Sequence, residues 1–295
     1  MTRNAYLLRD LTLLLLVLSL VFLIPFAMLR RGAAREAGSA ETNGRGAAAN
    51  GEGTPEADAG RVLPLGRAVE ERLRTAVEQT IFAQMRVLRD TPVNAGMERI
   101  LARLKPGMEG LPYDVGILVV ESNTVNALAF PGGLIVVFTG LVESLQTPEQ
   151  MAAVLAHELG HVVHRDALHQ LVRKMGLTTL LSLAGGPESA VLVKRIVEEA
   201  LHISFSRSVE ARADRFALDL LDSSGIDPAS LARALGNLKR EPPDDGVQRL
   251  LVYLDTHPPI AERIRAAEDF AAGRTPQTEP LAVDWTGLRA WLAER

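Results

Sequence analysis

Residues 151–164 constrain this chain most, because they form an apolar stretch that contains the sequence H-E-x-x-H at residues 157–161. An apolar surface on nearly every side predicts a helix buried in a core. Residues four apart share a helical face, so His157 and His161 can hold one metal ion. Glu158 would lie beside that ion as a carboxylate able to take a proton from water. Two ordinary core histidines are the alternative interpretation, but the cost of burying them unpaired favours the metal.

A catalytic zinc site usually takes three protein ligands and keeps one position open. The metzincin pattern would supply the third ligand from glycine and histidine positions that are here His164 and Ala167, so that class is excluded. A later segment offers carboxylates instead. Glu210 and Asp214 are four residues apart and share a helical face. We expect Glu210 to bind the metal and Asp214 to accept the free ring N–H of a ligand histidine.

Three further segments fit the same kind of site. Residues 126–141 contain N-A-L-A-F-P-G-G, residues 204–210 read S-F-S-R-S-V-E, and residues 256–259 read T-H-P-P with Arg263 after them. Over roughly residues 65–270 the chain resembles the gluzincin zinc metallopeptidases of the HtpX, Oma, BepA and CAAX prenyl endopeptidase types. It is most similar to the single-pass or periplasmic Oma-like and BepA-like members. The resemblance implies a mainly helical α+β fold of the minigluzincin type, with a small β-sheet beside the motif helix.

The resemblance also implies an activity, namely a zinc-dependent metalloendopeptidase that hydrolyses peptide bonds. One Zn²⁺ per chain would be held by His157, His161 and Glu210. Glu158 would be the catalytic base. His257 of the T-H-P-P segment would lie near the zinc, where it either stabilises the oxyanion or occupies the fourth metal position and keeps the enzyme latent.

Two arginines belong to the same expected site. By resemblance, Arg263 would hold Glu210 or Asp214 in place. Arg212 is a departure, because the family usually has an acidic residue between the ligand glutamate and the aspartate. We expect Arg212 to form an ion pair with Asp214 or Glu210, which changes the local charge but not the ligands.

The predicted substrate is a polypeptide that binds beside the motif helix. An extended, unfolded or misfolded chain could add to an edge strand through main-chain hydrogen bonds, although an ordinary internal strand fits the sequence equally well. Such a substrate, with the resemblance, suggests a role in envelope protein quality control. The alternatives are a latent protease with a chaperone-like role and a metal-stabilised, non-catalytic binding module. The residues expected to bind substrate are Asn126, Ala127, Leu128 and Ala129.

The N-terminus predicts a membrane anchor at residues 1–31. Residues 11–29 are almost entirely apolar and long enough to span a bilayer, and Arg30 and Arg31 follow at once. This length and flank favour an uncleaved, single-pass transmembrane helix over a signal peptide. The arginine distribution leans toward a cytoplasmic C-terminus. The resemblance leans toward the extracytoplasmic, periplasmic side of a bacterial cell membrane, and we follow the resemblance.

The rest of the chain divides into three expected parts. Residues 32–60 are rich in glycine and alanine and predict a flexible linker, residues 61–272 a metallopeptidase domain, and residues 273–295 a tail that packs back onto it. The net charge of −4 and the lack of a basic stripe argue against a nucleic-acid partner. Cysteine is absent, which excludes disulfides and thiolate zinc ligands.

Periodicity and turn signals predict the individual elements. Thr147 followed by Pro148 predicts the start of the motif helix. The remaining helices are expected at residues 67–90, 94–104, 194–221, from 227 onward and at 260–272, and strands at residues 113–121, 128–130 and 134–139.

Overall fold

A computed structural model describes the chain from residue 66 to residue 295, except for residues 109–110, 112–113, 183–188, 201, 240–249, 258 and 275–276. These residues belong to a compact unit that runs from Val62 to Arg295. The expected anchor at 1–31 and linker at 32–60 lie outside the described residues. Among the helices in the described ranges, none is both long and apolar enough to cross a membrane.

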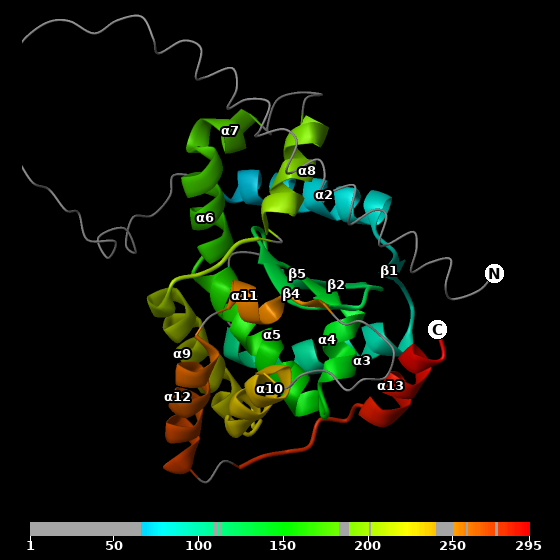
Figure 1. Ribbon diagram of the computed structural model, residues 1–295, viewed down its shortest axis with the longest axis vertical. Helices are drawn as coiled ribbons and strands as arrows, with labels where there is room; N and C mark the ends of the chain where they lie inside the picture. Colours follow the sequence, from blue (N-terminus) through cyan, green and yellow to red (C-terminus); the bar gives the residue numbers. More distant parts are fainter. Residues whose placement is uncertain are drawn as a thin grey trace, which may run out of the picture. The chain divides into compact units, whose positions relative to one another are not determined.

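Helix α5 (Pro148–Val163) is the central element of this unit (Figure 1). Its start is as predicted: Pro148 is the first helical residue, and the hydroxyl of Thr147 accepts a hydrogen bond from the Gln150 amide at 3.3 Å. The Gln150 side chain bonds the Gln146 amide at 2.7 Å rather than closing a capping box on Thr147. Nearly every residue of α5 is buried, as expected for a helix that is apolar all round.

A small mixed sheet lies beside α5. Strand β2 (Gly116–Val120) pairs in parallel with β5 (Leu134–Phe138), and β4 (Ala127–Phe130) pairs antiparallel with β5. Within the described residues the order is β1-β2-β5-β4, with β1 (Val87–Leu88) at one edge and β4 at the other. Gly132 and Gly133 make the β4–β5 turn with φ near 80°, a conformation that favours glycine.

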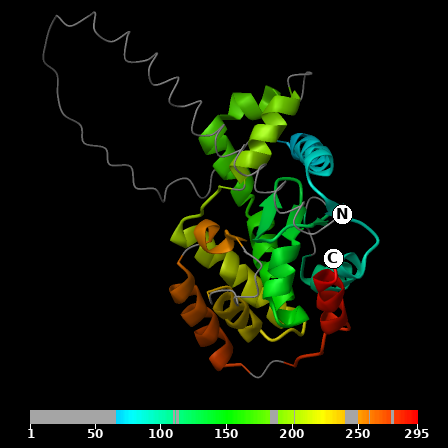
Figure 2. The ribbon, with the colours of Figure 1, turned by 45° about the vertical axis from the view of Figure 1, so that its right-hand side comes forward.

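The two faces of the sheet pack against different helices. On β5, Ile135 and Val137 join the core around α5, whereas Leu134 and Val136 join a second core with α2 (Arg67–Gln84) and α8 (Ser189–Ala200). The alternation follows from the two-residue period of a strand. Figures 1 and 2 show α2 and α8 on one side of the sheet and α5 on the other.

The remaining elements are α3 (Pro92–Leu104), η2 (Lys105–Met108), β3 (Thr124–Val125), α4 (Thr139–Ser144), α6 (Asp166–Met175), α7 (Leu177–Ser182), α9 (Arg207–Ser223), α10 (Ala229–Lys239), β6 (Leu250–Leu251), α11 (Tyr253–Thr256), α12 (Ile260–Ala272) and α13 (Trp285–Ala293).

Two predicted helices have the wrong extent. The helix expected at 67–90 ends at Gln84, because the following residues form β1 and pair with β2. The single helix expected at 194–221 is two helices, α8 and α9. Between them Ser206 has extended backbone angles as the residue before α9, and the Phe205 amide donates to the Thr256 carbonyl at 3.3 Å. Tertiary contacts therefore override helical propensity at this point.

The C-terminal segment packs back onto the α5 core. Leu281, Trp285, Leu288 and Leu292 are buried there. The indole Nε1 of Trp285 donates to the Leu145 carbonyl at 3.1 Å, close to the start of α5. Figure 1 shows the resulting position of α13 beside α3 and α4.

Candidate metal centre

Four buried side chains that can bind a metal converge from three parts of the chain. Helix α5 supplies His157 and His161, α9 supplies Glu210, and His257 follows α11. Gly160 lets α5 and α9 approach closely: a Cβ atom at Gly160 would lie only 3.0 Å from the Cα atom of Ala213. This close crossing brings Glu210 to the two histidines of α5.

The distances between these donor atoms match a tetrahedral metal site. The Nε2 atoms of His157 and His161 are 3.1 Å apart. In Glu210, Oε2 lies 3.4 Å from His157 Nε2, and the other oxygen, Oε1, lies 3.5 Å from His161 Nε2. Zinc–ligand bonds of about 2.05 Å in a tetrahedron place ligand atoms roughly 3.3 Å apart. A metal ion also resolves the close approach of two ring nitrogens, since each can then direct a lone pair at the ion. The residues present therefore fit a metal.

His257 lies next to two of these three ligand candidates. Its Nδ1 atom is 3.3 Å from His157 Nε2 and 3.0 Å from Glu210 Oε1. Its Nε2 atom is 3.7 Å from Glu158 Oε1. The ring stacks on Tyr253, with centroids 4.5 Å apart. Burial lowers the pKa of His257, which favours the neutral imidazole that a metal requires.

The first histidine is held by an aspartate and an arginine. His157 Nδ1 is 2.8 Å from Asp214 Oδ1. Arg263 donates through Nε and Nη2 to Asp214 at 2.7 Å each, and its Nη1 lies 2.7 Å from Glu210 Oε2. Burial favours the neutral form of Asp214, but the charge of Arg263 and the hydrogen bond from His157 outweigh it and lower the pKa to about 2. Asp214 is therefore an ionised acceptor, in contact with the residues that the sequence placed beside it.

The second histidine has a partner that the sequence interpretation missed. His161 Nδ1 is 2.9 Å from Asp166 Oδ2. Burial lowers the pKa of His161, but hydrogen bonds with Asp166 and Glu210 outweigh it and raise the pKa to about 9. Arg212 pairs with Asp166, not with Asp214 or Glu210 as expected. Asp166 is the first residue of α6, directly after the turn that ends α5, and that position next to the motif was the available signal.

The base candidate Glu158 faces a very small cavity. The cavity has a volume of about 10 Å³ and is lined by Glu158, His257 and mainly apolar residues: Leu128, Ala129, Ala167, Ala200, Ile203 and Phe205. One carboxylate oxygen of Glu158 is buried without a hydrogen-bond partner among the described residues. Of the four residues expected to bind substrate, Ala127, Leu128 and Ala129 lie on the edge strand β4. Asn126 is buried just before this strand.

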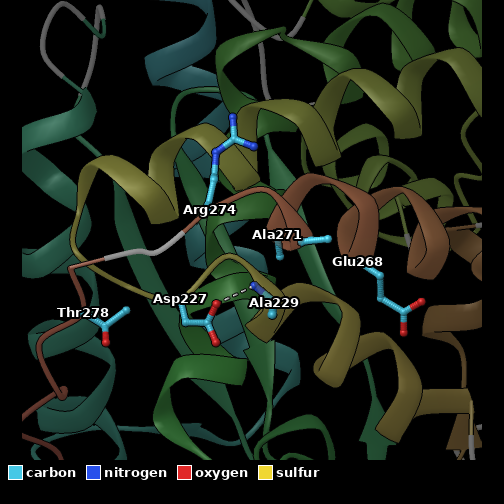
Figure 3. Close-up of a pocket in the computed structure, with 7 residues that line it drawn as sticks. Asp227, Ala229, Glu268, Ala271, Arg274 and Thr278 are labelled. Carbon is cyan, nitrogen blue, oxygen red and sulfur yellow. Dashed lines mark hydrogen bonds between the residues drawn. The ribbon is translucent and has the colours of Figure 1, made fainter.

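A larger pocket lies elsewhere, and its lining includes none of the metal-binding candidates. It has a volume of about 400 Å³ and lies between the start of α10 and the end of α12. Figure 3 shows Asp227 accepting a hydrogen bond from the Ala229 amide at its edge, at 3.0 Å. Asp227 also forms an ion pair with Arg233 through its other oxygen, so both carboxylate oxygens already have partners.

Comparison with known families decides the kind of site. Residues 88–271, more than half of the chain, match the model of peptidase family M48. The chain belongs to peptidase family M48. Membership implies a catalytic metal, and the four donors of the M48 domain described above could hold it.

Individual relatives carry names of metalloproteases. The chain is 34% identical to the mitochondrial metalloendopeptidase OMA1 of Arabidopsis thaliana, over 51% of this chain and 30% of that protein. It is 30% identical to the metalloprotease LoiP of Escherichia coli, over 52% of this chain and 62% of the relative. It is 28% identical to the beta-barrel assembly-enhancing protease of Escherichia coli, over 56% and 35%. The M48 chain thus spans less than two thirds of the length of these relatives.

Proposed function

We propose that this chain is a zinc-dependent metalloendopeptidase. His157, His161 and Glu210 would hold one zinc ion, and the tetrahedral spacing of their donor atoms is the observation that carries the proposal. Two imidazoles and a carboxylate are a donor set that suits zinc. Bound zinc supplies Lewis acidity, which polarises a peptide carbonyl and lowers the pKa of water toward about 7.

Glu158 is the proposed general base. One of its buried carboxylate oxygens accepts no hydrogen bond from the described residues, so it is free to take a proton from the attacking water. Glu158 then gives this proton to the leaving amine, so that the nitrogen departs as a neutral group. Asp214 and Arg263 keep His157 in the tautomer that presents Nε2 to the other donors.

We further propose that the enzyme rests in a latent state, with His257 in the fourth ligand position. Two observations support this state over a role for His257 in oxyanion stabilisation. His257 Nδ1 lies at ligand spacing from His157 and Glu210. The cavity at Glu158, about 10 Å³, has no room for a peptide. Substrate would enter only after His257 has moved away. A latent protease with a chaperone-like role is therefore the second candidate function.

The proposed substrate is an unfolded or misfolded polypeptide. Strand β4 lies at the edge of the described sheet, and two of its residues, Leu128 and Ala129, line the cavity at Glu158. An extended chain could pair with this edge through main-chain hydrogen bonds, which tolerate many sequences. Asn126 and Ala127 would complete the binding segment.

The proposed setting is envelope protein quality control. The apolar residues 11–29 would anchor the chain in a bacterial membrane, with the catalytic domain on the periplasmic side. The name of one relative, a beta-barrel assembly-enhancing protease, motivates this setting.

The test uses the full chain with casein as an unfolded substrate and a native globular protein for comparison. We expect the wild type to contain one zinc ion per chain and to cleave casein preferentially. Glu158→Gln should keep zinc and lose hydrolysis by about 10²- to 10⁴-fold. Glu149→Gln, on the same helix but away from the donors, is the matched control. A wild type that binds no zinc, or a fully active Glu158→Gln protein, would refute the proposal.

A further inference from the structure

A second aspartate–arginine pair contacts the cluster, at His161 rather than at His157. Asp166 Oδ2 is 2.9 Å from His161 Nδ1, and Arg212 Nη2 is 2.5 Å from the other oxygen, Asp166 Oδ1. The arrangement has the same form as His157, Asp214 and Arg263: a histidine, a buried carboxylate and a guanidinium in a row.

We propose that Asp166 and Arg212 are positioning residues for metal binding. Asp166 would fix the ring and the tautomer of His161, and Arg212 would fix Asp166. This inference rests on the proposed function, in which His161 binds zinc through Nε2.

Asp166 determines the tautomer of His161. When His161 is neutral, as metal binding requires, its imidazole carries one ring proton, and a hydrogen bond from Nδ1–H to Asp166 leaves the lone pair on Nε2. Nε2 is the atom that lies 3.1 Å from His157 Nε2 and 3.5 Å from Glu210. Stacking on Phe205, with ring centroids 4.2 Å apart, restricts tilting of the ring. The Asp166 hydrogen bond is the contact that selects which nitrogen faces the other donors.

Arg212 balances the charge on Asp166. Its side chain is only 4% exposed, so an ionised carboxylate there needs a counter-charge. Arg212 supplies it from α9, two residues after Glu210 on the same helix. Each oxygen of Asp166 then has its own partner, which prevents the carboxylate from rotating away from His161. The pair also links α6 to the helix that carries Glu210.

Asp166 should contribute more to zinc binding than Arg212. The Arg212 side chain is 35% exposed, and solvent therefore screens its interaction with Asp166. Asp166 itself contacts His161 directly. Loss of Asp166 should weaken zinc binding more than loss of Arg212.

A purely structural role makes a different prediction. If the pair only joins α6 to α9, its removal lowers the thermal midpoint of the metal-free protein and leaves the zinc affinity of the folded protein unchanged. If it positions His161, zinc affinity falls even where the metal-free protein is folded.

The experiment measures equilibrium zinc affinity of the full chain by competition with a chromophoric chelator, together with thermal unfolding of the metal-free protein. Asp166→Ala should weaken zinc binding by about 10- to 100-fold. Arg212→Ala should weaken it less, and Arg212→Lys should recover part of the loss. The double variant Asp166→Ala/Arg212→Ala should bind no more weakly than Asp166→Ala, because Arg212 acts through Asp166. Arg215→Ala removes an exposed pair with Asp219 on the same helix and should leave zinc affinity unchanged.

The outcomes separate this inference from the proposed function. If the wild type binds no zinc, or if His161→Ala binds zinc with wild-type affinity, the metal site itself is refuted. If Asp166→Ala binds zinc within about twofold of the wild-type affinity while His161→Ala binds it much more weakly, only the role of Asp166 is overturned. If Asp166→Ala does not fold, Asp166→Asn decides: it keeps the shape of the side chain but removes the charge, and its affinity must also fall.

Discussion

The close crossing of α5 and α9 at Gly160 predicts that even a methyl group there will impair the metal centre. In Gly160→Ala the new Cβ atom would lie 3.0 Å from both the Cα and the carbonyl oxygen of Ala213, closer than ordinary van der Waals contact. Helix α9 must retreat by a few tenths of an ångström. Overpacking of this kind costs about 1–3 kcal/mol, and the gain in helix propensity offsets about 1 kcal/mol. We expect a net loss of roughly 0–2 kcal/mol in unfolding free energy of the metal-free protein.

The effect on metal binding should exceed the effect on stability. Glu210 lies on α9, and metal–ligand distances tolerate shifts of only about 0.2 Å. We expect zinc affinity of Gly160→Ala to fall about tenfold, measured by chelator competition. The matched control is Gly236→Ala on α10, where an added Cβ meets no atom of the described residues within 4 Å. It should stabilise the protein by about 0.5–1 kcal/mol and leave zinc affinity unchanged. If Gly160→Ala behaves like Gly236→Ala, the reasoning about the crossing is wrong.

Four other predictions follow from the site and its surroundings. Removal of metal by a chelator should abolish casein hydrolysis and lower the thermal midpoint, and added zinc should restore both; activity that survives complete removal contradicts a metallopeptidase. His257→Ala should raise hydrolysis while zinc is retained, because it frees the fourth position; unchanged hydrolysis would rule out both roles considered for His257. Trp285→Ala removes a buried indole and its bond to Leu145, and should cost about 3–5 kcal/mol in chemical unfolding; a loss below 1 kcal/mol would show that the tail is dispensable. Glu70→Ala leaves the partly exposed Arg165 without this ion-pair partner and should cost about 1–3 kcal/mol in the same assay, whereas unchanged stability would count against the pair.

Local signals in the sequence were sufficient for the centre of the fold. Thr147 and Pro148 predicted the start of α5, and the apolar surface of residues 151–163 predicted its burial. The spacing of His157 and His161 predicted that both would face one point, and their Nε2 atoms lie 3.1 Å apart. These features depend only on helix geometry, which a sequence determines over a few residues.

Contacts between distant segments could not be derived in the same way. The partner of Arg212 is Asp166, because the close crossing of α5 and α9 brings Arg212 to the first residue of α6, just after the end of α5. Asp214 and Glu210 lie on the same helix as Arg212 and closer to it in the sequence. They were therefore the expected partners, and this prediction was wrong. Similarly, the break between α8 and α9 depends on a hydrogen bond from Phe205 to Thr256, which is visible only in the folded chain.

The most direct test of the central claim is anomalous diffraction at the zinc edge from crystals of the zinc-loaded protein. We expect one peak per chain, at about 2.0–2.2 Å from His157 Nε2, His161 Nε2 and a Glu210 oxygen. Glu158 should lie beside the metal without binding it. A peak bound by other residues, or no peak among these donors in zinc-loaded crystals, would contradict the account.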